Sequence, residues 1–381
     1  MSSSWPKGVR SNGVACGIKS GGAADLGVIV ADEAVAWAGT FTKNAAAAAP
    51  VTWCRGRLGG PVRAIVVNSG NANACTGPDG DAAVAATTDA AAAAIGCTPA
   101  EVLVASTGPI GVRLPVGKIT GALADAVAGA GPDKESFAAS ILTTDTRPKS
   151  IERGMGAARI SGVAKGAAML APNMATMLAF LVTDAAVDED VLQQALTQAV
   201  ARSFDRISVD ACESTNDSVF LLATGRGPRV GDDELAHALE TACKDLAQQM
   251  VRDAEGGSKL VRIRVTGAPD EDAAAGLGRA VAASTLWRSA LYGADPNWGR
   301  VLSALGSADR ALDLQRVLLS IGAETVFEHG APCGSLDLAA KQMAGDVVEV
   351  TCVVGDGAGA AEVLTSDLSP EYVTLNAYGT T

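Results

Sequence analysis

Histidine is the usual general base of nucleophilic enzymes, yet this sequence of 381 residues contains only His237 and His329. His237 falls in an amphipathic stretch and His329 in the turn-like Glu328-His329-Gly330, so a Ser-His-Asp or Cys-His arrangement has little to build on. An acyl-transfer reaction would therefore need another base. An α-amino group is a candidate, because its reference pKa of roughly 7.7–8.0 is close to neutral pH.

An internal threonine could become such an amino terminus. Thr176 follows the small residue Ala175, where an irregular segment meets the apolar run that reaches Phe180. Its hydroxyl can attack the preceding carbonyl and form an ester, and hydrolysis then leaves a threonine whose free amine activates its own hydroxyl. By itself the pattern is weak, because a threonine in an apolar run is more often an ordinary strand residue.

Two further segments could belong to the same site. Ser106-Thr107-Gly108-Pro109-Ile110-Gly111 follows a strand-like run, and its N–H groups can stabilise an oxyanion, although an ordinary Gly-Pro turn explains the same residues. The polar end Asn376-Ala377-Tyr378-Gly379-Thr380-Thr381 has no predicted helix. It is either frayed, as chain ends usually are, or folded into a site.

Strands and helices that alternate loosely must position these segments, which predicts an α/β or α+β class. No Gly-rich nucleotide loop follows any strand. Residues 146–176 form the longest irregular stretch, either a connector or a functional loop. The expected strands are Leu26–Val30, Ala64–Asn68, Val102–Ser106, Val219–Ala223, Leu260–Thr266, Val317–Gly322 and Val347–Val354, and the expected helices are Asp81–Ile95, Lys118–Ala128, Glu234–Ala254 and Gly276–Tyr292.

Composition excludes several functional classes. A net charge of −12 argues against a nucleic-acid partner. The eight cysteines form no C-x-x-C pair, which predicts free thiols and no metal site. The first ten residues lack the apolar core of a signal peptide, and the apolar run from Ala167 to Val182 is too short to span a bilayer. We therefore expect a cytoplasmic protein of two ordinary domains or one large one.

Many short motifs, in order along nearly the whole chain, resemble the ornithine acetyltransferases, also called glutamate N-acetyltransferases, of arginine biosynthesis. The motifs are Gly17-Ile18-Lys19, Asn68 to Gly77, Ser106-Thr107-Gly108, Thr143 to Thr146, Lys165-Gly166, Ala171 to Phe180, Arg206 to Asp210, Ser214 to Asp217, Ala254 to Lys259, Gly293 to Arg300 and the Thr-Thr end. Their shared order makes coincidence a poor explanation.

The resemblance implies an αββα sandwich that cleaves itself between Ala175 and Thr176. The products would be an α chain, 1–175, and a β chain, 176–381, which stay together and assemble as a dimer of αβ units (a heterotetramer) or larger. Thr176 would be the nucleophile, with Thr107 and Gly108 as the oxyanion hole. Substrate contacts would fall on Thr143, Lys165, Thr176, Glu255, Asn376 and Thr381, with Lys165 suited to a carboxylate and Glu255 to a side-chain ammonium.

The implied reaction is a ping-pong transfer without a cofactor. Thr176 takes the acetyl group of N2-acetylornithine, and glutamate then accepts it as N-acetylglutamate. Some family members also use acetyl-CoA, and the sequence leaves this open. Alternatives are a paralogue that acts on a different N-acyl amino acid in specialised metabolism, a related N-terminal-nucleophile amidohydrolase, and an amino-acid-binding protein without catalysis. No chemical role is assigned to Gly293 to Arg300 or to Asn71 and Asn73.

Overall fold

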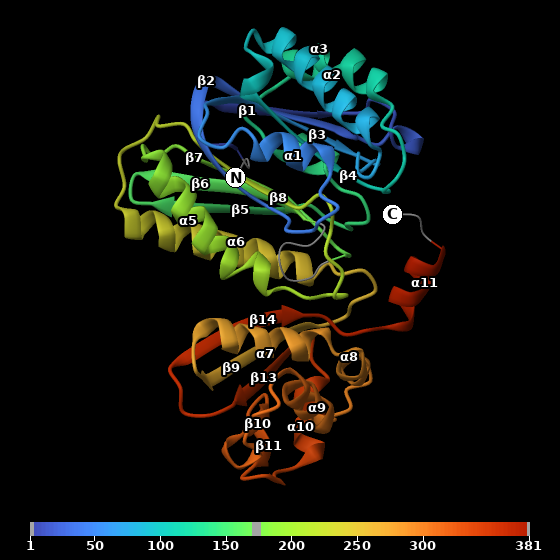
Figure 1. Ribbon diagram of the computed structural model, residues 1–381, viewed down its shortest axis with the longest axis vertical. Helices are drawn as coiled ribbons and strands as arrows, with labels where there is room; N and C mark the ends of the chain where they lie inside the picture. Colours follow the sequence, from blue (N-terminus) through green and yellow to red (C-terminus); the bar gives the residue numbers. More distant parts are fainter. Residues whose placement is uncertain (1–3, 170–176, 379–381) are drawn as a thin grey trace.

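The apolar runs of the sequence form two β-sheets, one in each of two bodies that lie one above the other (Figure 1). The structure is a computed structural model that describes residues 4–169 and 177–378. The first sheet has the strand order β4-β3-β2-β8-β7-β6-β5, with β1 paired to β2, and the second has the order β12-β11-β10-β13-β9-β14. The strands are β1 (Val9–Val14), β2 (Leu26–Phe41), β3 (Val62–Ser69), β4 (Val102–Thr107), β5 (Lys149–Met155), β6 (Ala158–Lys165), β7 (Leu178–Thr183), β8 (Ser218–Ala223), β9 (Leu260–Ala268), β10 (Leu318–Ile321), β11 (Glu324–Glu328), β12 (Ala331–Pro332), β13 (Val347–Val353) and β14 (Gly359–Thr365).

The predicted helices are present, with one correction. The stretch Gly276–Tyr292 was expected as a single helix, but it belongs to two helices, because the Ser284 hydroxyl caps the second by accepting a hydrogen bond from the Trp287 N–H. The α-helices are α1 (Ala49–Arg55), α2 (Pro78–Ile95), α3 (Val116–Ala128), α4 (Glu135–Ser140), α5 (Glu189–Ala201), α6 (Asp232–Val251), α7 (Glu271–Ala283), α8 (Thr285–Tyr292), α9 (Trp298–Ala308), α10 (Leu336–Met343) and α11 (Pro370–Tyr378).

The upper body is an αββα sandwich whose two strand layers share β2. The first part of this strand of 16 residues pairs with β1 and β3, and its last part, from Ala36, pairs with β8. The pairing with β3 shifts register between Val30 and Val35, where the strand passes from one layer to the other. Helices α2 and α3 cover one strand layer, and α5 and α6 cover the other (Figure 1). The predicted fold class is confirmed.

The strand β7 is apolar on both faces because it is covered on both faces. Leu178, Phe180 and Val182 belong to the core that the two strand layers share. The alternate residues Ala179 and Leu181 belong to the core formed with α5 and α6. The rings of Phe180 and Phe220 stack with their centroids 5.5 Å apart. This contact joins β7 to its parallel neighbour β8 near the start of both strands.

Two irregular segments of the sequence are regular in the structure. Residues 149–165 form the antiparallel hairpin of β5 and β6, although residues 146–176 were expected to be irregular. The hairpin is hard to recognise in the sequence because Lys149 and Lys165 resemble surface residues, although ion pairs with acidic residues accompany their burial. The C-terminal segment was expected to lack a helix, yet α11 includes Asn376 and Tyr378.

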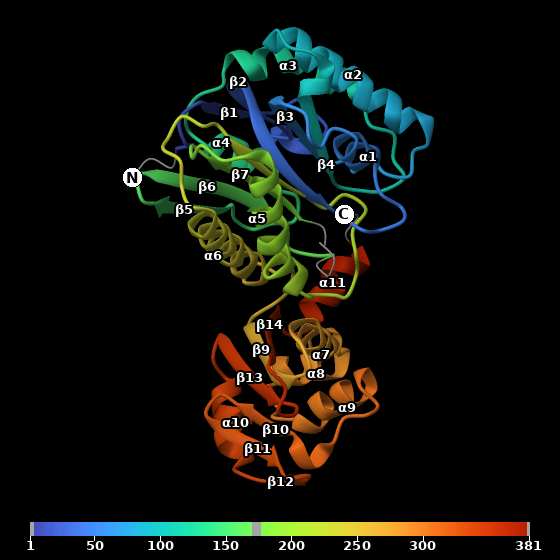
Figure 2. The same cartoon turned by 60° about the vertical axis from the view of Figure 1, so that its left-hand side comes forward.

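The lower body packs α7 to α10 around the second sheet, and its last strand returns the chain to the upper body. From β14 the chain runs into α11, which Figure 2 shows between the two bodies. The family signature Gly293 to Arg300 has a packing role here, since the Trp298 ring lies 5.3 Å from that of Phe327. Among residues 4–169 and 177–378, no helix is long and apolar enough to cross a membrane.

Candidate active site

A cavity of about 150 Å³ collects the predicted site residues that the structure describes. Its walls come from the ends of β4 and β6, from loops before β5 and β8, from the segment after α6, and from α11. Distant parts of the chain thus meet at one place. The predicted residues in its lining are Thr107, Gly108, Thr143, Lys165, Glu255 and Asn376. The predicted cleavage site, Ala175 and Thr176, and the predicted contact Thr381 lie outside the described residues.

A buried ammonium group organises one wall. Lys165, the last residue of β6, is only 2% exposed, and its Nζ donates hydrogen bonds to the hydroxyls of Thr107 (3.2 Å) and Thr143 (2.8 Å). Each hydroxyl accepts from Lys165, so each keeps its own proton for another acceptor. Burial lowers the pKa of Lys165, although the nearby charge of Asp145 opposes this effect. The wall therefore presents two oriented O–H donors.

Asp145 provides the counter-charge beneath this wall. Its carboxylate lies 3.8 Å from Lys165 Nζ, forms an ion pair with Lys149, and accepts from the Gly166 N–H at 2.6 Å. Although burial favours the neutral acid, the charges of Lys165 and Lys149 outweigh it and lower the pKa of Asp145 to about 2. Lys149 also pairs with Asp253, just after α6. These ion pairs fix the loop that carries Thr143 to the end of α6.

The opposite charge lies on another wall. Glu255 is held by its backbone N–H, which donates to Ala167 O at 2.9 Å, and by Asn376 Nδ2, which donates to its Oε2 at 3.0 Å. Its other oxygen, Oε1, is buried and makes no hydrogen bond with the described residues. A buried carboxylate oxygen without a partner is costly. The cavity is therefore suited to a ligand that supplies a cation there.

The turn after β4 requires glycine. Gly108 has φ +141°, and a Cβ on it would lie 2.4 Å from the Asn71 backbone nitrogen. The Thr107 carbonyl accepts from the N–H groups of Gly70 and Asn71, which brings this loop against the turn. Asn71 and Asn73 satisfy backbone groups: Asn71 Nδ2 donates to Val112 O, and Asn73 Nδ2 donates to Gly80 O. The close approach leaves Thr107 and Gly108 adjacent at the cavity.

Sequence reasoning gave no role to Asp217, which lies just before β8. Its Oδ1 accepts from the Met177 N–H at 2.9 Å, and Met177 is the residue that follows Thr176. Burial raises the pKa of Asp217 well above its usual value, against the opposing effects of that N–H and of the Lys165 charge. Its family motif, Ser214 to Asp217, was the available signal. A buried carboxyl group with a raised pKa thus touches the backbone next to the predicted nucleophile.

Other lining residues also come from motifs that had no assigned role. Asp210 ends the motif that starts at Arg206, and Ser214, Thr215 and Asn216 precede Asp217. Asn216 Nδ2 donates to Ala72 O and Ser106 O, at 2.6 and 2.9 Å, and so ties the loop before β8 to the turn after β4. The lining residues that were not predicted are Ala72, Ile110, Thr144, Ala168, Met169, Asp210, Cys212, Ser214, Thr215, Asn216 and Tyr372.

Known proteins resemble this chain over almost its full length. The model of the ArgJ family matches residues 10–381. The arginine biosynthesis bifunctional protein ArgJ of Thermus thermophilus is 43% identical over 380 residues, which cover 99% of both chains. The protein of the same name from Streptomyces avermitilis is 42% identical over 382 residues, again 99% of both. A crystal structure of arginine biosynthesis bifunctional protein argJ from Bacillus halodurans is 33% identical, with a TM-score of 0.50, and the match covers 52% of this chain and 97% of that one.

Proposed function

The chain belongs to the ArgJ family, and from that premise we propose that it is an acetyltransferase of arginine biosynthesis that moves the acetyl group of N2-acetylornithine to glutamate. One observation carries this proposal. Six residues to which the family resemblance assigns roles, from separate parts of the chain, line one cavity. That cavity holds a buried cation, Lys165, on one wall and the carboxylate of Glu255 on another.

We propose that the nucleophile is Thr176, released by self-cleavage after Ala175. The α chain would then be 1–175 and the β chain 176–381. The Bacillus halodurans chain supports this division by its length, because about half of the present chain matches almost all of it. We further propose that the enzyme works in the cytoplasm as a dimer of αβ units.

In the first half-reaction, the Thr176 hydroxyl attacks the acetyl carbonyl and its proton passes to the Thr176 amine. The hydroxyl of Thr107 and the N–H of Gly108 stabilise the oxyanion, because Lys165 leaves the Thr107 proton available. The carbon–nitrogen bond to ornithine then breaks, and the leaving nitrogen takes the proton from the Thr176 amine. In the second half-reaction, the glutamate amine attacks the acetyl-threonine ester, and Thr176 regains its hydroxyl.

The substrate ammonium has a specific place in this scheme. We propose that the side-chain ammonium of ornithine binds Glu255 Oε1, the buried oxygen without a described partner. Asn376 fixes the same carboxylate through Oε2, which gives α11 a role in substrate binding. Thr143, and Thr381 at the chain end, are further proposed contacts. Lys165 is proposed to attract the α-carboxylate through its charge.

Two measurements test the proposal. Intact mass spectrometry under denaturing conditions should show two fragments, the second beginning at Thr176, and Thr176→Ala should remain a single inactive chain. With N2-acetylornithine alone, the enzyme should release one equivalent of ornithine and stall, and glutamate should restart it. Continuous release of acetate without an acceptor would instead identify an amidohydrolase, and an uncut wild-type chain would remove the proposed base.

A further inference from the structure

A second cavity, of about 320 Å³, lies where the lower edge of the upper body meets the second sheet. Its walls come from the end of α5, from α6, and from β9 and β14 (Figure 1). Four cationic side chains line it, Arg202, Arg206, Lys244 and Arg264, against the single carboxylate of Glu362. In a chain of net charge −12, this concentration of positive charge is an exception. None of these residues takes part in the proposed acetyl transfer.

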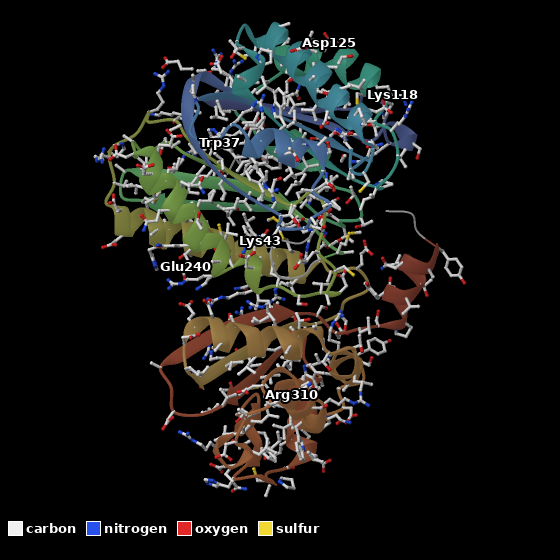
Figure 3. All side chains as sticks on the ribbon, in the orientation of Figure 1. Trp37, Lys43, Lys118, Asp125, Glu240 and Arg310 are labelled. Carbon is white, nitrogen blue, oxygen red and sulfur yellow. The ribbon has the colours of Figure 1, made fainter. Side chains whose placement is uncertain are left out.

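Three of the cations are held in place from outside the lining, whereas Arg264 pairs with Glu362 inside it at 3.5 Å. Arg202 donates two hydrogen bonds to Glu271, at 3.0 and 3.1 Å, and Arg206 contacts the same carboxylate. Glu240 pairs with Lys244 at 2.6 Å, and Figure 3 shows Glu240 at the edge of the upper body that faces the lower one. Neither Glu240 nor Glu271 lines the cavity. These ion pairs therefore orient Arg202, Arg206 and Lys244 without filling the space between them.

One donor in this cluster is unused. The Arg206 side chain is only 12% exposed, and its Nε is buried and hydrogen-bonds to no described residue. A buried guanidinium N–H without an acceptor costs free energy that a bound oxyanion would recover. The Nε and Nη2 atoms of Arg202 are already bonded to Glu271, so the guanidinium donor without a described acceptor is Nε of Arg206.

We propose that this cavity is a binding site for a small organic anion that carries carboxylate or phosphate groups. Lys244 and Arg264 supply charge from opposite bodies, one from α6 and one from β9, so the anion joins the two bodies. The volume of this second cavity, about 320 Å³, is about twice the 150 Å³ of the candidate active site, and the two cavities have no lining residue in common. The anion is therefore a ligand additional to the acetyl-transfer substrates.

The position of the site couples it to the active-site walls. Arg206 begins the segment that leads to Asp210, and the Ser208 N–H on the way donates to Leu364 O at 2.9 Å. Leu364 lines the anion site, and its strand leads into α11 and Asn376. Binding at the second cavity therefore stiffens two chain segments that reach the first.

The test is thermal unfolding of the cleaved wild-type protein, with inorganic phosphate or citrate added at constant ionic strength. Binding to the native state raises the Tm as anion concentration increases. The half-exposed pair Lys244→Gln and Arg264→Gln, made together, should weaken the anion affinity about ten-fold or more. The control pair Arg229→Gln and Arg310→Gln removes the same charge from exposed positions away from the cavity and should leave the affinity unchanged.

Each outcome decides the proposal. A Tm rise that is lost in the first pair and kept in the control supports it, and the more effective probe shows whether phosphate or carboxylate is preferred. No Tm rise with either probe, or equal rises in both variants, overturns it. Hydrogen exchange should slow in residues 207–210 and 364–367 when the anion binds, and unchanged exchange there would refute the coupling. None of these readouts requires turnover, so they stand apart from the acetyl-transfer assays.

Discussion

The Nζ of Lys165, the last residue of β6, lies 3.2 Å from the hydroxyl oxygen of Thr107, the last residue of β4. The two strands belong to different layers of the sandwich, and this hydrogen bond joins their ends at the cavity. Lys165 thus acts on the proposed oxyanion hole through Thr107, in addition to any direct contact with substrate.

Lys165→Met should lower kcat by about 10²–10³-fold, the typical effect of losing an oxyanion donor, because the Thr107 hydroxyl loses its orientation. Thr107→Val should have a similar effect and Thr107→Ser a small one. The double variant should be scarcely worse than either single variant, since both remove the same hydrogen bond. Steady-state kinetics measures this, with the exposed Lys118→Met as control. Fully additive losses would show that the two residues act independently.

Glu255→Gln should raise the KM for N2-acetylornithine by about ten-fold or more, because it removes the charge that faces the substrate ammonium. Asn376→Ala should raise KM less, since Asn376 only orients Glu255 through the bond of 3.0 Å. An N-acetyl amino acid of similar length without the ammonium serves as a matched substrate. Its KM should not rise in Glu255→Gln, and an equal rise for both substrates would contradict the assignment.

Asp145→Asn should lower the free energy of unfolding at neutral pH by about 3 kcal/mol, because it leaves the buried Lys165 without its closest carboxylate. The folded-state pKa of about 2 lies below the reference value of 3.8. The contribution of the Asp145 carboxylate to the free energy of unfolding is therefore present above about pH 4 and is lost as pH falls toward 2. Urea unfolding at pH 7, 4 and 3 measures the free energy of unfolding of Asp145→Asn and of wild type. The difference between the two should shrink at the lowest pH, and a difference that is constant with pH would contradict this prediction.

Asp217→Asn should become more stabilising as pH rises. The pKa of Asp217 is raised in the folded state, so wild type loses stability as pH climbs from the unfolded-state pKa through the folded one, while asparagine stays neutral. Its amide oxygen can still accept from the Met177 N–H. Urea unfolding at pH 5 and 8, in a Thr176→Ala background that keeps each chain whole, measures the effect.

The exposed Asp125→Asn is the control for Asp217 and should give equal stability changes at both pH values (Figure 3). Asp217→Asn would fail as a prediction if its stability relative to wild type fell between pH 5 and pH 8. That result would mean that the buried carboxylate is charged in the native protein.

The sequence by itself determined the fold class, the family and about half of the strands that the structure describes. Apolar runs such as Val219–Ala223 predict buried strands because burial on both faces demands an unbroken run. Ordered motifs pointed to Thr107, Lys165 and Glu255 as residues of one site. Apolar runs are local patterns, and family motifs are short stretches of adjacent residues, so a single sequence displays both directly.

Only the tertiary structure decided how charges are paired. The hairpin of β5 and β6 looked irregular because its buried Lys149 and Lys165 read as surface residues. They are buried because Asp145 and Asp253 neutralise them, and Lys149 and Asp253 lie 104 residues apart. The basic cavity likewise joins Arg206 to Arg264 across two bodies. Such pairs have no local signature, because Coulomb interaction depends on distance in space and not on separation along the chain.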